Sequence, residues 1–281
     1  MKRSSARTVP RPFLKWAGGK GQLSGELICR VDQAGAIGRY HEPFIGGGAL
    51  FFELVRTQRL GRRQAYLADN NSNLIEAYRG VKEDVEAVIV QLKMHAERHC
   101  EAYYYAVRSA IPSTLVGRAA RVIYLNRTCF NGLFRENSKG LFNVPFGRYK
   151  NPMICDEANL QACAQALRRA VVEARPFETV LDRAKAGDFV YFDPPYVPLS
   201  ATSNFTSYGK GGFGEDSQRR LAEVFAELAQ RGVRVLLSNS ETPLVRELYR
   251  DFTIEVVYAT RLVNSRADRR GKIAEVLVRN F

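Results

Sequence analysis

Short apolar runs, each followed by a turn and a stretch with helical spacing, recur along this chain. We expect strands where such runs stand between turn residues, at 40–44, 65–68, 170–174, 189–192 and 233–239. Apolar residues at helical spacing predict helices at 49–57, 217–231 and 243–249. Strand and helix units in alternation are typical of an α/β protein with a parallel sheet.

Residues 72–155 interrupt this alternation. Their pattern is helical and polar, without a strand-turn-helix unit. Two further strand candidates, 254–259 and 273–279, flank a charged loop and are expected to pair antiparallel. The sequence therefore predicts one α/β domain, formed by residues 1–71 and 156–281, with a smaller helical domain inserted at 72–155.

Composition and charge narrow the class of protein. The chain has 281 residues, of which 46% are hydrophobic, so it can bury a substantial core. Its 42 Lys and Arg against 29 Asp and Glu give a net charge of +13, which favours a polyanionic partner such as nucleic acid. Basic residues concentrate in 1–20, 118–150 and 261–272, where phosphates would bind; a basic but merely solvated surface is the competing interpretation.

Cysteine and histidine usage gives no sign of a disulfide frame or a metal centre. The five cysteines are odd in number and have no CxxC spacing, which indicates reduced thiols in a cytosolic protein. His95, His99 and Cys100 have helical spacing and could ligate a metal, but no second cluster completes such a site, so a solvated helix face is preferred. Without an apolar leader or a membrane-length run, we expect a soluble, cytoplasmic protein.

The motif Asp193-Pro194-Pro195-Tyr196 directly follows the strand at 189–192. Two prolines force that strand to stop, at the edge where open α/β sheets bind ligands. An amine bonded to Asp193 and a proline carbonyl would keep its lone pair free to attack, while Tyr196 stacks on the flat group that carries it. A Pro-Pro turn that merely ends a core strand is the plain alternative.

A glycine turn supplies the other half of the predicted site. Gly46, Gly47 and Gly48 stand between a strand and a helix, and Asp69 ends the next strand, at a spacing typical of a carboxylate that binds ribose hydroxyls. The turn does not match GxGxxG, so an adenosine cofactor without a pyrophosphate is favoured. Beside the Asp193 motif this suggests S-adenosylmethionine and methyl transfer to an exocyclic amine.

Several motifs resemble those of Dam-type DNA adenine-N6 methyltransferases. They follow one another along the chain in the order of the class alpha amino-methyltransferases. They are 13–20 (FLKWAGGK), 42–48 (EPFIGGG), 67–71 (LADNN), 124–127 (YLNR), 130–133 (FNGL), 142–150 (FNVPFGRYK), 193–196 (DPPY), 198–202 (PLSAT) and 204–206 (NFT). The resemblance implies a Rossmann-like S-adenosylmethionine-dependent methyltransferase sheet with an inserted helical target-recognition domain. The insertion at 72–155 occupies that position.

The resemblance also implies roles for individual residues. Asp193, Pro194, Pro195 and Tyr196 would form the catalytic amine site. The cofactor would contact Trp16, Ala17, Gly18, Lys20, Phe44, Gly46, Gly48, Asp69, Phe177 and Asp193. Double-stranded DNA would contact Lys15, Arg127, Phe130, Asn131, Leu133, Arg135, Pro145, Arg148 and Asn204. Arg135 as a bidentate donor to guanine O6 and N7 is also physically natural.

These matches favour methylation of adenine N6 in GATC by a base-flipping enzyme. A basic enzyme without an obvious dimer helix is expected to act as a monomer, and the His and Cys spacing predicts no metal. Where the family often has tyrosine, this chain has Phe130, which keeps a stacking face but lacks the hydroxyl; the loop 209–214 also departs from the family. Methylation of RNA adenine or of a protein glutamine is an alternative, since such turns serve those reactions too. A catalytically inactive DNA-binding module is another.

Overall fold

The computed structural model describes residues 8–16, 18, 20–137, 139–196, 213–260 and 272–281. The chain forms two compact units. One consists of Met1–Gly19, Gly46–Arg62 and Asn71–Ala174, and the other of Lys20–Ile45, Arg63–Asn70 and Arg175–Phe281. The division at residues 72 and 155, expected from the change in sequence pattern, stays a prediction.

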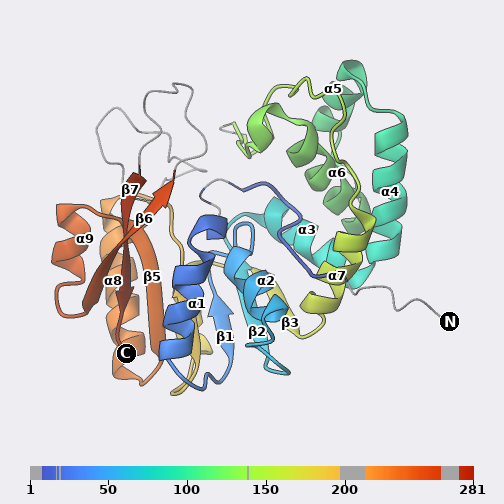
Figure 1. Cartoon of the computed structure of the whole chain (residues 1–281). Helices are drawn as coiled ribbons and strands as arrows, with labels where there is room; N and C mark the ends of the chain where they lie inside the picture. The colour runs from blue at the N-terminus through green and yellow to red at the C-terminus, as the bar shows by residue number, and fades with distance from the viewer. Residues whose placement is uncertain (1–7, 17, 19, 138, 197–212, 261–271) are drawn as a thin grey trace. The chain divides into compact units, whose positions relative to one another are not determined.

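The second unit contains six strands of a seven-stranded mixed sheet, in the order β2-β1-β4-β5-β7-β6 (Figure 1). Strands β1, β2, β4 and β5 are parallel, whereas β7 is antiparallel to both β5 and β6. The strands are β1 (Tyr40–Glu42), β2 (Ala65–Asp69), β4 (Phe189–Phe192), β5 (Arg234–Ser240), β6 (Thr253–Thr260) and β7 (Lys272–Arg279). This sheet confirms the predicted α/β class and the antiparallel pair.

The register brings the carboxyl ends of four parallel strands to one edge. Tyr40 of β1 is paired with Ala65 of β2 and with Phe189 of β4, which is in turn paired with Arg234 of β5. Strand order reverses between β1 and β4, and open sheets bind ligands outside the carboxyl ends at such a switch point. β1 ends at Glu42, before the predicted end at residue 44, because Pro43 has no N–H to continue the ladder.

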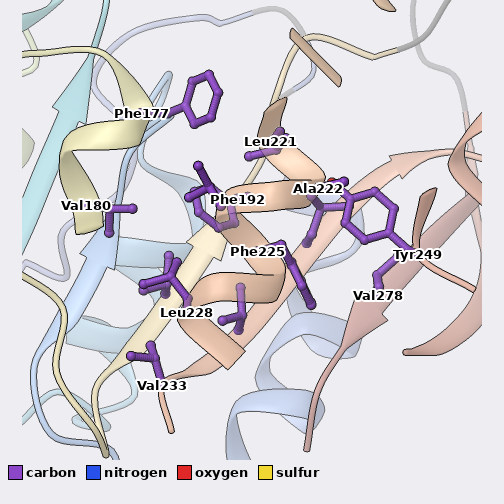
Figure 2. Packing of buried hydrophobic residues seen from close by; sticks show 14 of the residues in the cluster. Phe177, Val180, Phe192, Leu221, Ala222, Phe225, Leu228, Val233, Tyr249 and Val278 are labelled. Atoms are coloured by element: carbon purple, nitrogen blue, oxygen red, sulfur yellow. The ribbon is translucent and has the colours of Figure 1, made fainter. Parts of the chain in front are cut away.

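The core of this unit lies between the sheet and α8 (Glu215–Gln230). Leu221, Phe225 and Leu228 recur at helical spacing on α8 and are fully buried. Figure 2 shows these side chains packed against Phe192 of β4 and Val278 of β7. The other helices of the unit are η1 (Lys20–Gln22), α1 (Ser24–Gln33), η3 (Phe177–Asp182) and α9 (Pro243–Leu248). The pattern along the chain did not predict α1.

The first unit is mainly helical. It contains α2 (Ala49–Arg56), α3 (Ser72–Glu83), α4 (Val85–Glu97), α5 (Glu101–Ser109), α6 (Leu115–Thr128), η2 (Phe130–Gly132), α7 (Glu157–Leu167) and β3 (Ala170–Ala174). Side chains of Asn71, Asp84, Thr114 and Asp156 cap helix N-termini. A Cβ on Gly80 of α3 would lie 2.3 Å from the Cβ of Ala119 on α6, so glycine lets these helices approach closely.

Residues 133–156 differ from the helical pattern expected there. Their described part contains no helix; the chain instead folds back through the bridges Glu136↔Phe142 and Cys129↔Phe146. Gly140 has φ +74° in the turn between the paired segments, a conformation that favours glycine.

The two histidines weighed as metal ligands bind tyrosine hydroxyls. His95 Nδ1 lies 2.8 Å from the Tyr103 hydroxyl, and His99 Nδ1 lies 2.9 Å from that of Tyr124. Within the described ranges, no group of three or more His, Cys, Asp or Glu side chains is arranged to hold a metal ion. Those ranges also contain no helix with the length and hydrophobicity needed to span a bilayer.

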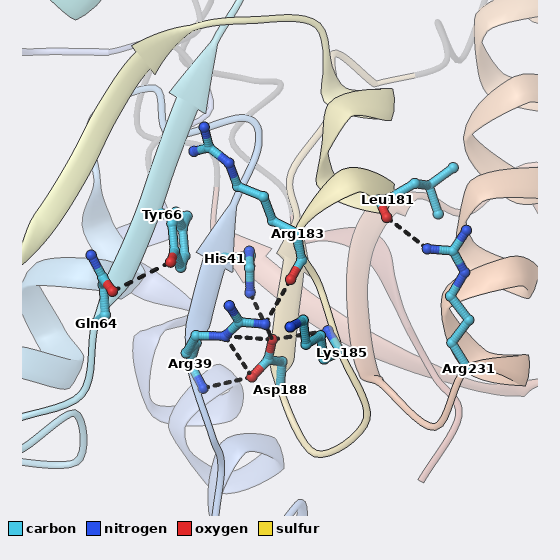
Figure 3. A network of polar contacts seen from close by, with 9 residues as sticks. All are labelled: Arg39, His41, Gln64, Tyr66, Leu181, Arg183, Lys185, Asp188 and Arg231. Carbon is cyan, nitrogen blue, oxygen red and sulfur yellow. Dashed lines mark hydrogen bonds and ion pairs between the residues drawn. The ribbon is translucent and has the colours of Figure 1, made fainter.

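A buried ion-pair network closes the opposite end of the parallel strands (Figure 3). Asp188, which precedes β4, accepts hydrogen bonds from the Arg39 guanidinium and backbone N–H and from the Lys185 N–H. His41 Nε2 lies 3.1 Å from the same carboxylate. Burial alone would raise the pKa of Asp188, but these hydrogen bonds together lower it to about 2.

Asp188→Ala should lower the free energy of unfolding by about 3–5 kcal/mol, because it leaves Arg39 and His41 without their buried acceptor. Urea unfolding followed by circular dichroism measures the change. Glu223→Ala, which removes the exposed partner of Arg220 on α8, is the matched control and should leave the midpoint unchanged. Equal midpoints for Asp188→Ala and the wild type would contradict a stabilising network.

Stability should fall as pH drops below about 6.5. Burial lowers the pKa of His41 from 6.5 to about 4, so the unfolded chain binds a proton over this interval that the folded chain does not. Asp188 causes a further loss of stability as the pH falls from 3.8 toward 2. Its pKa is lowered in the folded state, so the unfolded chain binds the proton at a higher pH than the folded chain does. In urea titrations across pH, His41→Gln, which keeps an N–H donor but does not titrate, should reduce the slope between pH 6.5 and 4; an unchanged slope would refute this assignment.

Candidate active site

Asp193 lies immediately after β4, at the carboxyl edge of the sheet, where the apolar run of the strand ends. Its Oδ1 accepts a hydrogen bond from Ser238 Oγ on β5 at 3.0 Å and lies 3.0 Å from Lys20 Nζ. The Tyr191 hydroxyl lies 2.9 Å from the same Ser238 oxygen. Burial raises the pKa of Asp193 above its ordinary value, and the Lys20 ammonium and the Ser238 hydroxyl, which favour the carboxylate, oppose this increase only in part.

Tyr196, at the end of the motif, is held by its ring and by its hydroxyl. The hydroxyl donates to Glu275 Oε2 on β7 at 2.5 Å. Lys20 Nζ lies 4.2 Å from the centre of the ring, in cation–π contact, and 3.7 Å from the same Glu275 oxygen. Because the Lys20 side chain is only 6% exposed, its charge acts on both carboxylates with little screening.

A hydrogen-bond chain fixes the turn from behind. Gln218 Nε2 on α8 donates to the Pro195 carbonyl at 3.0 Å, and Asn239 Nδ2 on β5 donates to Gln218 Oε1 at 3.0 Å. Both amides are buried. Pro194 is buried as well, so the four residues of the motif are braced by neighbouring elements of the same unit.

Three of the predicted cofactor residues come together at the same edge of the sheet. The rings of Phe44 and Phe177 stack with centroids 5.3 Å apart and an interplanar angle of 25°. Asp69 ends β2, beside β1, whose end leads into Phe44; the Ile45 N–H donates to the Ala68 carbonyl at 2.9 Å and joins the two strand ends. This edge therefore offers aromatic faces together with a carboxylate.

The glycine turn belongs to the first unit, with Trp16. Gly46 and Gly48 have φ of +46° and +70°, and the Tyr78 hydroxyl donates to the Gly46 carbonyl at 3.1 Å. A Cβ on Gly46 would lie 2.9 Å from Trp16 Cδ1, so the glycine lets the indole lie against the turn. Gly18 also has a positive φ, +77°. Ala17, predicted in the same loop, lies outside the described residues.

Hydrogen bonds to its backbone N–H and carbonyl hold Lys15 in place. Asn126 on α6 accepts from the Lys15 N–H and donates to the Lys15 carbonyl, both at 2.7 Å, and also donates to the Gly132 carbonyl at 3.1 Å. A Cβ on Gly132 would come within 2.5 Å of the Lys15 side chain. Lys15 Nζ lies 4.8 Å from the centre of the Tyr149 ring. Asn126 thus joins two segments of the predicted DNA-contact set.

The remaining predicted DNA contacts of this segment form one cluster in the first unit. The Phe130 N–H donates to the Pro145 carbonyl at 2.9 Å, which holds the two chain segments side by side. Phe130 is 51% exposed and Leu133 38%, so both large apolar side chains are accessible to solvent. Asn131 and Arg148 adopt left-handed backbone, with φ of +55° and +52°. The exposed members are Phe130, Asn131, Leu133, Arg135, Pro145 and Arg148.

The basic residues between 118 and 150 fall into two groups. Arg118 pairs with Glu76, Arg121 donates to the carbonyls of Val107 and Arg108, and Arg127 donates to the Phe13 carbonyl at 2.8 Å. Burial lowers the pKa of both Arg121 and Arg127. The residues whose side chains are exposed are Arg135, Lys139, Arg148 and Lys150. The predicted DNA contact at Arg127 therefore has a partner within its own unit.

Sequence reasoning missed Ser238, Glu275 and Asn126. Ser238 begins the polar run Ser-Asn-Ser that ends the apolar strand β5, and Glu275 interrupts the apolar run of β7, so both had a detectable signal. Asn126 lies within the YLNR motif without an assigned role. Asn204, predicted to contact DNA, lies outside the described residues.

Lys20→Met should raise the pKa of Asp193, because it removes the nearby positive charge and leaves burial less opposed. Titration of the side-chain carboxyl carbon by ¹³C NMR measures this pKa. Ser238→Ala should shift it in the same direction, and Lys185→Met, before β4 at the other end of the strand, should leave it unchanged. A lower pKa for Asp193 in Lys20→Met would contradict the role given to the ammonium.

Comparison with known proteins agrees with this arrangement. Residues 16–263 match the family of D12 class N6 adenine-specific DNA methyltransferases. The chain is 44% identical to the type II methyltransferase M1.LlaDCHI of Lactococcus lactis subsp. cremoris, with 96% of this chain and 95% of the relative covered. It is 41% identical to the type II methyltransferase M.MjaIII of Methanocaldococcus jannaschii, covering 96% and 99%. Identity to the DNA adenine methylase of Escherichia coli K12 is 36%, covering 95% and 94%. The chain therefore belongs to the D12 class N6 adenine-specific DNA methyltransferases.

Proposed function

We propose that this enzyme transfers a methyl group from S-adenosylmethionine to adenine N6 within GATC in double-stranded DNA, as a monomer that flips the target base. The observation that carries the reaction is the Asp193 carboxylate, held beside the Tyr196 ring at the carboxyl end of β4. Residues 1–71 and 156–281 would form the catalytic domain, and 72–155 the target-recognition domain.

The residues at the sheet edge fit an adenosine cofactor without phosphates. Asp69 offers a carboxylate suited to ribose hydroxyls, and Phe44 and Phe177 offer ring faces suited to a purine. The resemblance also assigns Trp16, Ala17, Gly18, Gly46 and Gly48 to the cofactor. When bound, the cofactor supplies an electrophilic methyl group, so the protein needs to position the amine and does not have to activate it chemically.

The catalytic turn would orient the exocyclic amine of adenine. Both contacts described for the Asp193 side chain use Oδ1, from Lys20 and Ser238, and we assign Oδ2 to the amine hydrogen. The Pro194 carbonyl would accept the second hydrogen. With both hydrogens held, the nitrogen lone pair is directed away from the turn, and Tyr196, fixed by Glu275, would stack on the base. Lys20 supports this step because its ammonium opposes the effect of burial on the pKa of Asp193 and favours the carboxylate, which can accept.

The cluster in the first unit suits recognition of duplex DNA. The exposed Arg135 guanidinium can donate to guanine O6 and N7, and Lys15 would read a second guanine. Phe130, exposed by half, and Asn131 would fill the stack from which the target base is removed. Leu133 and Pro145 would pack on base edges, with Arg127, Arg148 and Asn204 near the backbone.

Transfer of labelled methyl from S-adenosylmethionine to duplexes that differ only in GATC tests this proposal. The wild type should label the GATC duplex, and Asp193→Ala should abolish labelling while DNA binding persists, because the substitution removes the amine acceptor. Asp251→Ala, at an exposed position after α9, is the control and should be fully active.

Each part of the proposal fails on a different result. If the wild type labels no adenine-containing duplex, the proposed cofactor, S-adenosylmethionine, or the proposed substrate, duplex DNA, is wrong. Equal labelling of every duplex would remove the GATC specificity and leave the reaction. Loss of DNA binding together with turnover in Asp193→Ala would point to a structural role for this carboxylate.

A further inference from the structure

Arg135 does not extend freely from the first unit: Asn143 holds its side chain. Arg135 Nε donates to Asn143 Oδ1 at 2.7 Å, and Arg135 Nη2 lies 3.5 Å from the Asn143 carbonyl. The two backbones are also joined, since the Asn143 N–H donates to the Arg135 carbonyl at 3.0 Å.

Local pairing explains why these residues meet. Glu136 and Phe142 form an antiparallel bridge, and the Asn137 N–H donates to the Leu141 carbonyl at 2.9 Å, so the chain folds back on itself. Side chains alternate between faces along such segments. Phe134 and Phe142 are buried and pack together with centroids 5.5 Å apart. Arg135 and Asn143, each one residue further along, therefore share the outer face.

The segment that carries Asn143 is firmly anchored. The next residue, Val144, is 1% exposed, and its carbonyl accepts hydrogen bonds from the Tyr104 hydroxyl at 2.8 Å and from Arg108 Nη1 at 3.2 Å, both on α5. Tyr104 is itself fully buried. Asn143 is thus a side chain on a fixed support, able to restrain a long and exposed neighbour.

We propose that Asn143 is a specificity-determining positioning residue, which presents the Arg135 guanidinium edge-on to guanine. This inference rests on the proposed function, in which Arg135 reads a guanine of the target. Arg135 Nε carries a single hydrogen, which it donates to Asn143 Oδ1. The two terminal amino groups of Arg135 are then the donor pair that matches guanine O6 and N7. Asn143 also limits the rotation of the Arg135 side chain in the DNA-free protein.

The size of the effect follows from that restraint. Immobilising one long side chain costs a factor of about 2 to 12 in a binding constant. A bidentate pair with guanine discriminates by a factor of about 5 to 150. Loss of the restraint should therefore remove a measurable part of the discrimination at one guanine, and leave discrimination at the other unchanged.

A hemimethylated GATC duplex with one target adenine makes each guanine position distinct. Replacing either guanine with 7-deazaguanine removes N7 alone, and the loss of kcat/KM for each replacement defines a penalty for that position. Arg135→Ala should abolish the penalty at one position and thereby identify the guanine that Arg135 reads. Asn143→Ala should reduce the penalty at the same position at least about threefold, and Arg135→Ala/Asn143→Ala should resemble Arg135→Ala alone.

Two further variants separate positioning from general structure. Asn143→Asp keeps an oxygen acceptor for Nε, so it should retain the penalty while its negative charge raises KM for every duplex. Asn73→Ala removes the 2.7 Å hydrogen bond to Glu136, the residue after Arg135, and is the matched control; its penalties should equal those of the wild type.

The outcomes distinguish this inference from the proposed function. If Arg135→Ala abolishes one penalty but Asn143→Ala leaves it intact, the positioning role of Asn143 is wrong and the reading of guanine by Arg135 stands. An equal loss in Asn73→Ala would likewise overturn it, in favour of general loosening of the segment. If Arg135→Ala changes neither penalty, the proposed role of Arg135 fails, and the inference fails with it.

Discussion

The Asp193 carboxylate, placed where the apolar strand β4 ends, is supported by groups from several elements of the second unit. Burial disfavours the charge on Asp193, so the protein has to supply a cation and a hydrogen-bond donor nearby. Lys20 comes from η1 and Ser238 from β5, while Glu275 on β7 holds the neighbouring Tyr196. β4, β5 and β7 are far apart in the sequence, and their order in the sheet brings Ser238 and Glu275 to the edge where Asp193 and Tyr196 lie.

The elements that this edge requires were predictable because they are the most apolar parts of the chain. The apolar runs at 170–174 and 189–192 are strands with those bounds, and the predicted antiparallel pair corresponds to β6 and β7. α1 escaped prediction because it buries only Leu27 and Val31, too few positions to define a periodicity. α7 buries Leu160, Cys163 and Leu167 at helical spacing, but it begins after the segment 72–155, where no element was predicted before the strand at 170–174.

Side-chain partners were harder to predict than backbone elements. The motif containing Asp193 was evident in the sequence, but its bond to Ser238 depends on the register of β4 and β5, where Phe192 is paired with Leu237. Arg121 and Arg127 are a second case in which the sequence does not reveal the partners of a side chain. Their charge suggested phosphate contacts, yet both guanidinium groups donate to backbone carbonyls, since the helix that carries them is largely buried. Charge counts cannot separate such arginines from exposed ones.

The position of β7 has a consequence for how the protein matures. β7 follows β6 in the chain but lies between β5 and β6, so β6 has no sheet edge to join until β7 has been synthesised. Glu275, which fixes the Tyr196 hydroxyl, is carried by this same strand. Until β7 pairs with β5, the Tyr196 hydroxyl therefore lacks its Glu275 acceptor. The arrangement makes the support of Tyr196 depend on completion of the sheet.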